Sequence, residues 1–218
     1  MSMTFHDTIE THFPTRVMQR RHESVADLNT ALFQVIDGLR QRYADSAENA
    51  VNTGQVSTQG GYQTSTRMNF LQRTEPAVTA FRDQVLMPAV KSYFEEVFGD
   101  AAVRLKYWTM GWSNMLREGD WQGPHMHPTP YNLASGVYYV KLPPDKPPPQ
   151  GCIEFISPHP ISAHHGDVTT RRIVPHEGEL LLFPPYYMHY VHPFKGPGER
   201  AIISFDVIKH PLDVTFTF

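Results

Sequence analysis

The sequence predicts a mainly β fold with flanking helices, arranged as an antiparallel sandwich or jelly roll. Three observations predict it. After residue 100, short β-branched and aromatic runs follow one another, and proline, glycine and polar turns separate them. Before residue 100, apolar residues instead recur every three or four positions, as in amphipathic helices. The composition is that of a soluble globular chain, because 40% of the residues are hydrophobic and 19% are charged.

A single domain suits a chain of 218 residues. We expect residues 1–100 to provide mostly helical support and loops, and residues 101–218 to form the jelly-roll core. The strands of that core are expected at residues 103–110, 133–142, 152–156, 179–183, 187–191 and 201–208.

Two helices are expected before the core. Ser24 can cap the first, whose apolar positions recur as far as Tyr43. The second begins at Thr74 and ends at Gly99, and Pro88 should kink or divide it.

Two further segments are expected to be loops. Residues 45–66 are polar and without periodicity, with a short strand near Tyr62. Residues 143–150 are rich in proline and predict a stiff hairpin loop.

Charge and cysteine content exclude several classes of protein. A formal net charge of −3 gives no general reason to bind nucleic acid or an anionic membrane. Cys152 is the only cysteine, so no intrachain disulfide is expected and a reducing compartment fits. The first 18 residues mix apolar with charged residues, unlike a signal peptide or membrane span. We therefore expect a cytoplasmic protein.

Histidines near two strand ends suggest a metal site. His125 and His127 stand at i and i+2 on an extended segment, so both imidazoles point to the same side. A third histidine on a returning strand would complete three corners of a site. His189 and His192 compete for that place, because they would face opposite sides of a strand. At most one of the two reaches the metal.

Other polar residues leave two readings open. Arg200 can grip a carboxylate inside a barrel with two parallel hydrogen bonds, or be a surface residue after a Gly-Pro-Gly turn. Histidines within or next to an expected irregular excursion at residues 157–172 are either exposed or part of a lid over the pocket. They are His159, His164, His165 and His176.

Five short motifs carry a resemblance. They are Trp112-Ser-Asn114, Gly119-Asp-Trp-Gln-Gly-Pro-His-Met-His-Pro128, Ser135-Gly-Val-Tyr-Tyr-Val140, Phe183-Pro-Pro-Tyr-Tyr-Met-His189, and Arg200 with Ser204-Phe205. Together they resemble the small bacterial and phage type of 2-oxoglutarate- and iron(II)-dependent oxygenase. The resemblance extends over residues 112–207, with a fainter echo in residues 13–15 and 60–64.

The resemblance implies a cupin-like double-stranded β-helix whose cofactors are Fe(II) and 2-oxoglutarate. It implies that the metal ligands are His125, His127 and His189. Arg200 would bind the far carboxylate of 2-oxoglutarate. Asn114, Tyr138 or Tyr139 would hydrogen-bond the co-substrate, and Ser135 and Gly136 would serve packing.

The motif departs from the usual oxygenase site in one respect. That site has two histidines and one carboxylate on one face of the iron, whereas here His127 stands in the carboxylate position. Three neutral imidazoles would leave the iron with a higher positive charge. Glu154 could supply a carboxylate if its strand faces inward.

The expected function is a hydroxylase-type oxidation of a C–H bond in a small molecule or a peptide side chain. One alternative is a three-histidine, cupin-like dioxygenase that does not use 2-oxoglutarate. Another is a non-catalytic jelly-roll module that binds a metal or ligand. Only the expected 2-oxoglutarate-dependent oxidation needs Arg200 inside the barrel. The apolar tail at residues 214–218 could be an edge strand or pair with a second subunit, so a homodimer stays open.

Overall fold

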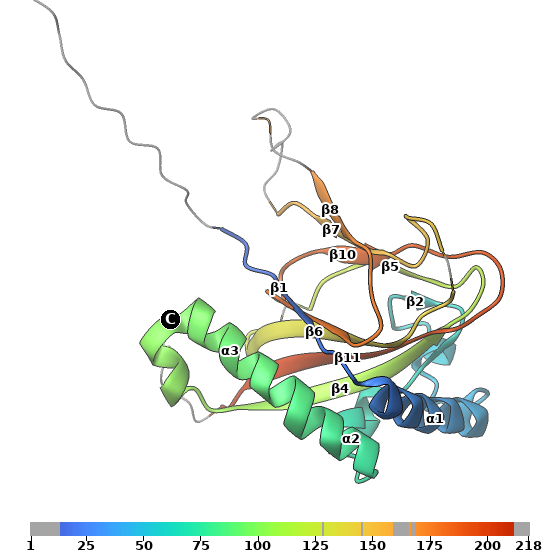
Figure 1. Ribbon diagram of the computed structural model, residues 1–218, viewed down its shortest axis with the longest axis horizontal. Helices are drawn as coiled ribbons and strands as arrows, with labels where there is room; N and C mark the ends of the chain where they lie inside the picture. Colours follow the sequence, from blue (N-terminus) through green and yellow to red (C-terminus); the bar gives the residue numbers. More distant parts are fainter. Residues whose placement is uncertain (1–13, 128, 145, 159–165, 167–168, 212–218) are drawn as a thin grey trace, which may run out of the picture.

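Two antiparallel sheets face each other in a computed structural model that describes residues 14–127, 129–144, 146–158, 166 and 169–211 (Figure 1). The larger sheet has the order β1 (Met18–Arg21), β9 (Glu179–Phe183), β6 (Asn132–Lys141), β11 (Arg200–Lys209), β4 (Tyr107–Leu116) and β3 (Tyr62–Gln63). The smaller has the order β2 (Thr58–Gln59), β5 (Trp121–His125), β10 (His189–Val191), β7 (Ile153–Ile156) and β8 (Thr170–Ile173). The predicted mainly β fold with flanking helices is confirmed.

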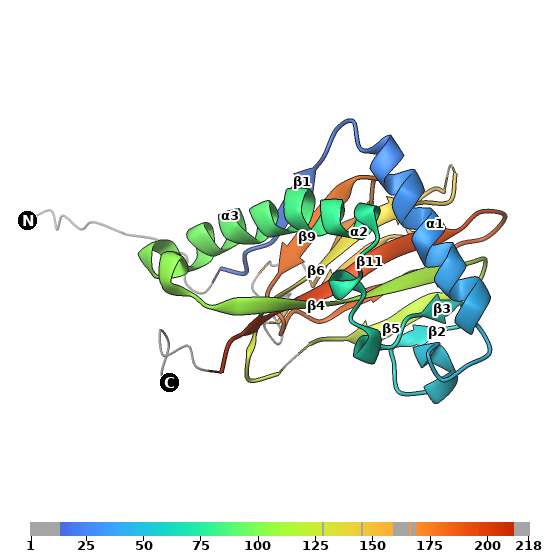
Figure 2. The same ribbon diagram turned by 90° about the horizontal axis from the view of Figure 1, so that it is seen from below.

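The helices cover only the larger sheet, on the side away from the smaller one (Figures 1 and 2). They are α1 (Ala26–Tyr43), α2 (Pro76–Ala80) and α3 (Met87–Phe98). Short 3-10 turns occupy Ala50–Thr53, Thr66–Met68, Phe70–Gln72 and Gly99–Arg104. The sheets therefore enclose one apolar layer, and the helices bury a second.

Strand β11 shows how the sequence separates the two layers. Its odd-numbered residues, such as Phe205, pack in the core beneath the helices. Its even-numbered residues, from Arg200 to Asp206, line a cavity between the sheets. This alternation follows from the two-residue period of a strand, so one strand supplies both the helix-covered core and the site.

The structure agrees with part of the helix prediction. Pro76 lies in the first turn of α2, as expected, and Gly99 ends α3 with a φ of 55°. A π-helical stretch at Phe81–Leu86 precedes Pro88, which lies in the first turn of α3. Residues 76–98 stay helical throughout, so Pro88 does not interrupt the helix, and the hydrogen-bond pattern changes just before it, where proline cannot donate to the helical ladder.

The predicted cap of α1 was wrong. Ser24 has a φ of 57°, and Val25 occupies the cap position without a side-chain hydrogen bond. The chain reverses here between β1 and α1, and the backbone N–H of His22 is tied to the carbonyl oxygen of Gly178 at 3.0 Å. This turn places Ser24 outside the capping geometry.

Some strand predictions also need correction. A 3-10 turn delays the start of β4 to Tyr107. Strand β8 begins within the stretch predicted to be irregular and runs one residue beyond it. Residues 143–150 do not form a hairpin loop, because they connect β6 of one sheet to β7 of the other. The short strand expected near Tyr62 is β3.

Two further expectations concern parts of the chain outside the described residues. These are the predictions for His159, His164 and His165 and for the tail at residues 214–218. In the described ranges, every helix is too short or too polar to cross a bilayer.

Close packing explains why the Ser-Gly-Val-Tyr-Tyr motif has a glycine at position 136. A Cβ there would lie 2.4 Å from the carbonyl oxygen of Leu181 and 2.4 Å from Cζ of Phe205. We expect Gly136→Ala to lower the free energy of unfolding by about 1–3 kcal/mol, because the overpacking is against backbone. Denaturant unfolding measures this.

Gly38→Ala is the matched control. Gly38 lies within α1, and a Cβ there would meet nothing within 4 Å. Alanine should raise the free energy of unfolding by roughly 0.5–1 kcal/mol. Equal effects of the two substitutions would contradict the packing role of Gly136.

Candidate metal centre

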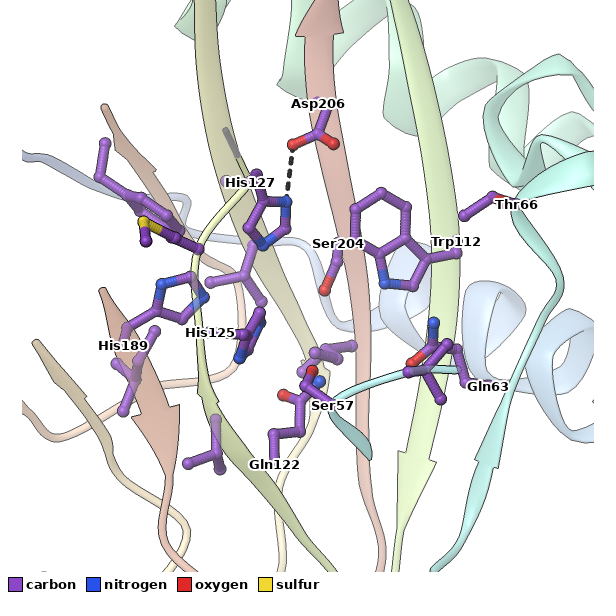
Figure 3. Close-up of a pocket in the computed structure, with 18 of the residues that line it drawn as sticks. Ser57, Gln63, Thr66, Trp112, Gln122, His125, His127, His189, Ser204 and Asp206 are labelled. Atoms are coloured by element: carbon purple, nitrogen blue, oxygen red, sulfur yellow. Dashed lines mark hydrogen bonds and ion pairs between the residues drawn. The ribbon is translucent and has the colours of Figure 1, made fainter. Parts of the chain in front are cut away.

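Three imidazoles meet between the sheets. His125 ends β5, His127 follows two residues later, and His189 begins β10 directly opposite His125 in the strand register. Their ligand atoms lie within 4.8 Å of one another, and the rings face a common space (Figure 3). The backbone N–H of His127 donates to the carbonyl oxygen of Pro185 at 2.8 Å, which ties the segment after β5 to the segment before β10.

The hydrogen bonds of each ring fix which nitrogen is free. His125 Nδ1 lies 2.7 Å from the carbonyl oxygen of Gly123, and His189 Nδ1 lies 2.9 Å from that of Tyr187. His127 Nδ1 lies 2.9 Å from Oδ1 of Asp206. Because these oxygens accept, each Nδ1 carries the proton and each Nε2 keeps a lone pair. His127 Nε2 is buried and has no partner among the described residues.

Burial keeps two of these rings neutral. It lowers the pKa of His125 to about 4, with a smaller contribution from the charge of His127. Burial also lowers the pKa of His189 to about 3, with a further contribution from His125. Since metals bind neutral imidazole, the rings are in their ligating form at neutral pH.

The cluster opens into a cavity of about 540 Å³. Besides the three histidines, this cavity is lined by Gln55, Val56, Ser57, Gln63, Thr66, Trp112, Gln122, Met126, Thr129, Gly136, Val137, Ile153, Phe183, Val191, Arg200, Ile202, Ser204 and Asp206. Trp112 stacks on His127 with the ring centroids 5.6 Å apart. A larger cleft, of about 670 Å³, lies near Tyr93 and Tyr186 and contains none of the three histidines.

Arg200 lies inside the barrel, not on the surface. It is 1% exposed and lines the same cavity as the histidines. None of its three guanidinium nitrogens has a hydrogen-bond partner among the described residues, and neither has the buried hydroxyl of Tyr139. The guanidinium carbon lies 5.2 Å from the centroid of the Tyr139 ring. A buried charge without a partner is costly, so this corner is built for an anion.

The other predicted co-substrate residues are placed differently. Tyr138 lies on the opposite face of β6 from Tyr139, in the core beneath the helices, and its hydroxyl donates to Oδ1 of Asn29 at 2.7 Å. It is therefore not placed to touch a ligand in the cavity. Asn114 donates from Nδ2 to Thr58 and Gln63 at 3.1 and 2.9 Å. Both of its N–H groups are thus in use, its buried Oδ1 has no partner among the described residues, and Asn114 does not line the cavity.

Glu154 does not complete the metal site. It accepts hydrogen bonds from Nε and Nη2 of Arg172 at 2.9 and 2.8 Å, and its Oε2 lies 2.7 Å from His192 Nε2. Its neighbours Ile153 and Phe155 turn toward the layer between the sheets. Glu154 and His192 therefore form a separate cluster, and His189 belongs to the metal-type cluster.

This separate cluster predicts a pH-dependent stability. Burial alone would raise the pKa of Glu154, but hydrogen bonds from His192, Thr170 and Arg172 and the charge of Arg172 lower it to about 2. A carboxyl with a lowered folded pKa stabilises the fold above its ordinary pKa of 4.5 and loses that contribution as the pH falls toward 2.

We expect Glu154→Gln to lower the free energy of unfolding by about 1–3 kcal/mol at neutral pH. The difference from wild type should shrink below about pH 4. Denaturant unfolding at several pH values measures it, and a difference that does not change with pH would contradict this account.

Sequence reasoning missed two residues of the site. Asp206 accepts from His127 and, at 2.7 Å, from Oγ of Ser135. Ser135 was assigned to packing, yet its hydroxyl orients this carboxylate. The signal was present for Asp206, because it lies an even number of residues from Arg200 on one strand and must share its face.

Comparison with known proteins agrees with the geometry. A family model described as "Putative 2OG-Fe(II) oxygenase" matches residues 110–206, from β4 to β11. The matched residues, which are less than half of the chain, are thus similar to the core of a 2OG-Fe(II) oxygenase. The protein is accordingly an oxidoreductase of the dioxygenase type whose cofactors are Fe(II) and 2-oxoglutarate. No curated protein sequence matches the chain.

Solved oxygenases share the fold of this chain at low identity. A Pseudomonas putida prolyl-4-hydroxylase is 15% identical with a TM-score of 0.56, covering 89% of this chain and 92% of its own. A Trichoplax adhaerens prolyl hydroxylase, in complex with a hypoxia inducible factor peptide fragment, is 13% identical with a TM-score of 0.63, covering 93% and 87%. The carbocyclase SnoK from nogalamycin biosynthesis is 9% identical with a TM-score of 0.57, covering 88% and 79%. The double-stranded β-helix is thus the common architecture.

Proposed function

We propose that His125, His127 and His189 hold the Fe(II), and that Arg200 and Tyr139 hold the far carboxylate of 2-oxoglutarate. The observation that carries this proposal is the buried, unpartnered guanidinium of Arg200 in the same cavity as the three imidazoles. A dicarboxylate with a keto acid at one end would satisfy both ends of the cavity. Its far carboxylate would accept from the guanidinium and the Tyr139 hydroxyl.

The residues of the chain prepare this site before any ligand binds. When bound, iron and 2-oxoglutarate use O₂ to turn a substrate C–H into C–OH, with succinate and CO₂ as the other products. The Nδ1 hydrogen bonds hold the three rings with Nε2 free. Trp112 packs on the His127 ring and limits its movement. The protein thereby supplies a fixed set of nitrogen ligands in the cavity between the sheets.

The rest of the lining favours an uncharged substrate. Arg200 and Asp206 are the only Asp, Glu, Lys or Arg residues among the described residues that line the cavity. Amide and hydroxyl side chains such as Gln55, Ser57 and Thr66 can bind neutral polar groups, and Met126 offers apolar contact. We therefore propose a neutral small molecule or a neutral peptide side chain as the substrate.

Anaerobic titration of the Fe(II)-loaded protein with 2-oxoglutarate tests the proposal. A keto acid that chelates the metal produces a visible metal-to-ligand charge-transfer band. We expect a saturable band at about one 2-oxoglutarate per iron. If iron binds but no band appears, a three-histidine dioxygenase that does not use 2-oxoglutarate, or a binding module, becomes the better reading.

Those two alternatives are less favoured because neither requires a buried Arg200. A cytoplasmic location also remains part of the proposal, since Cys152 is a buried free thiol. Homodimer formation stays a prediction that size-exclusion chromatography with light scattering would check.

A further inference from the structure

We propose that Asp206 is a positioning residue that supplies, through His127, the carboxylate charge which the three-histidine ligand set lacks. The inference rests on the proposed function, because it assumes that the histidines hold a divalent metal. Asp206 is 6% exposed and lies on β11, across the cavity from the end of β5. Figure 3 shows its carboxylate directed at the His127 ring.

The hydrogen bonds of Asp206 orient it toward His127. Oδ1 of Asp206 accepts from Nδ1 of His127 at 2.9 Å and from Oγ of Ser135 at 2.7 Å. The amide Nδ2 of Asn132 in turn donates to Ser135 Oγ at 3.0 Å and to the His127 carbonyl oxygen at 3.2 Å. The carboxylate and the histidine backbone are therefore held by one connected network.

His127 is the only ring of the three with this arrangement. The Nδ1 groups of His125 and His189 donate to neutral backbone carbonyl oxygens. Only His127 donates to a carboxylate, and it is the residue that stands where the usual oxygenase motif has its own carboxylate ligand. The negative charge of Asp206 thus acts on His127, the ligand that replaces the usual carboxylate.

The hydrogen bond from His127 to Asp206 changes the net charge around the metal. Three neutral imidazoles leave a divalent metal with a local charge of +2, whereas two imidazoles and one carboxylate leave +1. In the described parts of the chain, Asp206 has no Lys or Arg ion-pair partner. Its negative charge is therefore available to the His127 ring and the metal, and restores the net +1. A histidine that donates to a carboxylate is also a more basic ligand.

Asp206→Asn tests the charge separately from the hydrogen bond. The amide oxygen can still accept from His127, but the negative charge is gone. We expect Fe(II) to bind about tenfold more weakly, at the lower end of the 10- to 100-fold range for such outer partners. The Fe(III)/Fe(II) potential should rise, because less negative charge disfavours Fe(III). Asp206→Ala, which removes both contributions, should weaken binding by nearer 100-fold.

Glu154→Gln is the matched control. Glu154 is also a buried carboxylate bonded to a histidine, His192, but that pair lies outside the cluster. Its substitution should leave both iron affinity and potential unchanged. A wild-type affinity and potential in Asp206→Asn would overturn the inference while leaving the proposed function intact. Wild-type protein that binds no iron would overturn both.

A second pair of variants tests whether Asp206 acts through the His127 ring. His127→Asp supplies a carboxylate to the metal directly and removes the imidazole to which Asp206 is bonded. In that background Asp206→Asn should weaken Fe(II) binding much less than the roughly tenfold expected in the wild-type background. An equal loss of affinity in both backgrounds would show that Asp206 does not act through His127.

Discussion

Replacement of His189 by alanine should abolish stoichiometric iron binding while the fold persists. His189 supplies one of the three nitrogen ligands, and its ring is held between Nδ1 donation to Tyr187 and contact with Phe183. Metal binding to a structural site with four protein ligands has a free energy of about 10–16 kcal/mol. The loss of one ligand should therefore weaken the affinity for Fe(II) roughly 100- to 1,000-fold. Anaerobic titration with Fe(II), or with Co(II) as a spectroscopic probe, measures this loss.

Two further variants define what the result means. His125→Ala should behave like His189→Ala, because the two residues face each other across β5 and β10. His192→Ala removes an imidazole three residues from His189, but one that is bonded to Glu154. It should retain wild-type iron affinity. Tight iron binding by both His125→Ala and His189→Ala would overturn the metal assignment, and circular dichroism confirms that each variant is folded.

The strand period made part of this site predictable from sequence. His125 and His127 were expected on one side of an extended segment, and the structure brings them together. The same reasoning applied to β11 would have found Asp206, since it shares the parity of Arg200. What the sequence lacked was any sign that this carboxylate faces a histidine 79 residues away.

The alternation of side chains along a strand could not by itself show which other residues face the cavity. Tyr138 and Tyr139 must face opposite sides of β6, but both sides are buried, one beneath helices and one between sheets. Hydrophobic pattern therefore gives no preference between them. Glu154 posed the same difficulty on β7, and only the positions of Arg172 and His192 show that it faces away from the cavity.

Connections between the sheets were the least predictable feature. Residues 143–150 were read as a hairpin loop because adjacent strands in a chain often pair, whereas here they cross between sheets. Such pairings depend on contacts between distant segments, which local composition does not record. The competition between His189 and His192 was of the same kind, because the register of β10 against both β5 and β7 decides it.

Arg200→Met should weaken 2-oxoglutarate binding and stabilise the ligand-free protein at the same time. Truncation of one partner in a buried charge pair costs about 2–5 kcal/mol, so co-substrate affinity should fall by roughly 30-fold to several thousandfold. The ligand-free protein buries this guanidinium without a partner in the described residues. An apolar side chain of similar length should therefore raise the free energy of unfolding by about 1–4 kcal/mol.

The opposite signs of these two effects make the test of Arg200 specific. Arg200→Ala should show the same loss of 2-oxoglutarate affinity, but a cavity would offset its gain in stability. Arg172→Met is the control, because Arg172 pairs with Glu154 outside the cavity and should leave co-substrate affinity unchanged. The charge-transfer band measures affinity, and denaturant unfolding measures stability. Unchanged 2-oxoglutarate affinity in Arg200→Met would remove Arg200 from the site, since a buried guanidinium that anchors the co-substrate cannot be replaced without loss of binding.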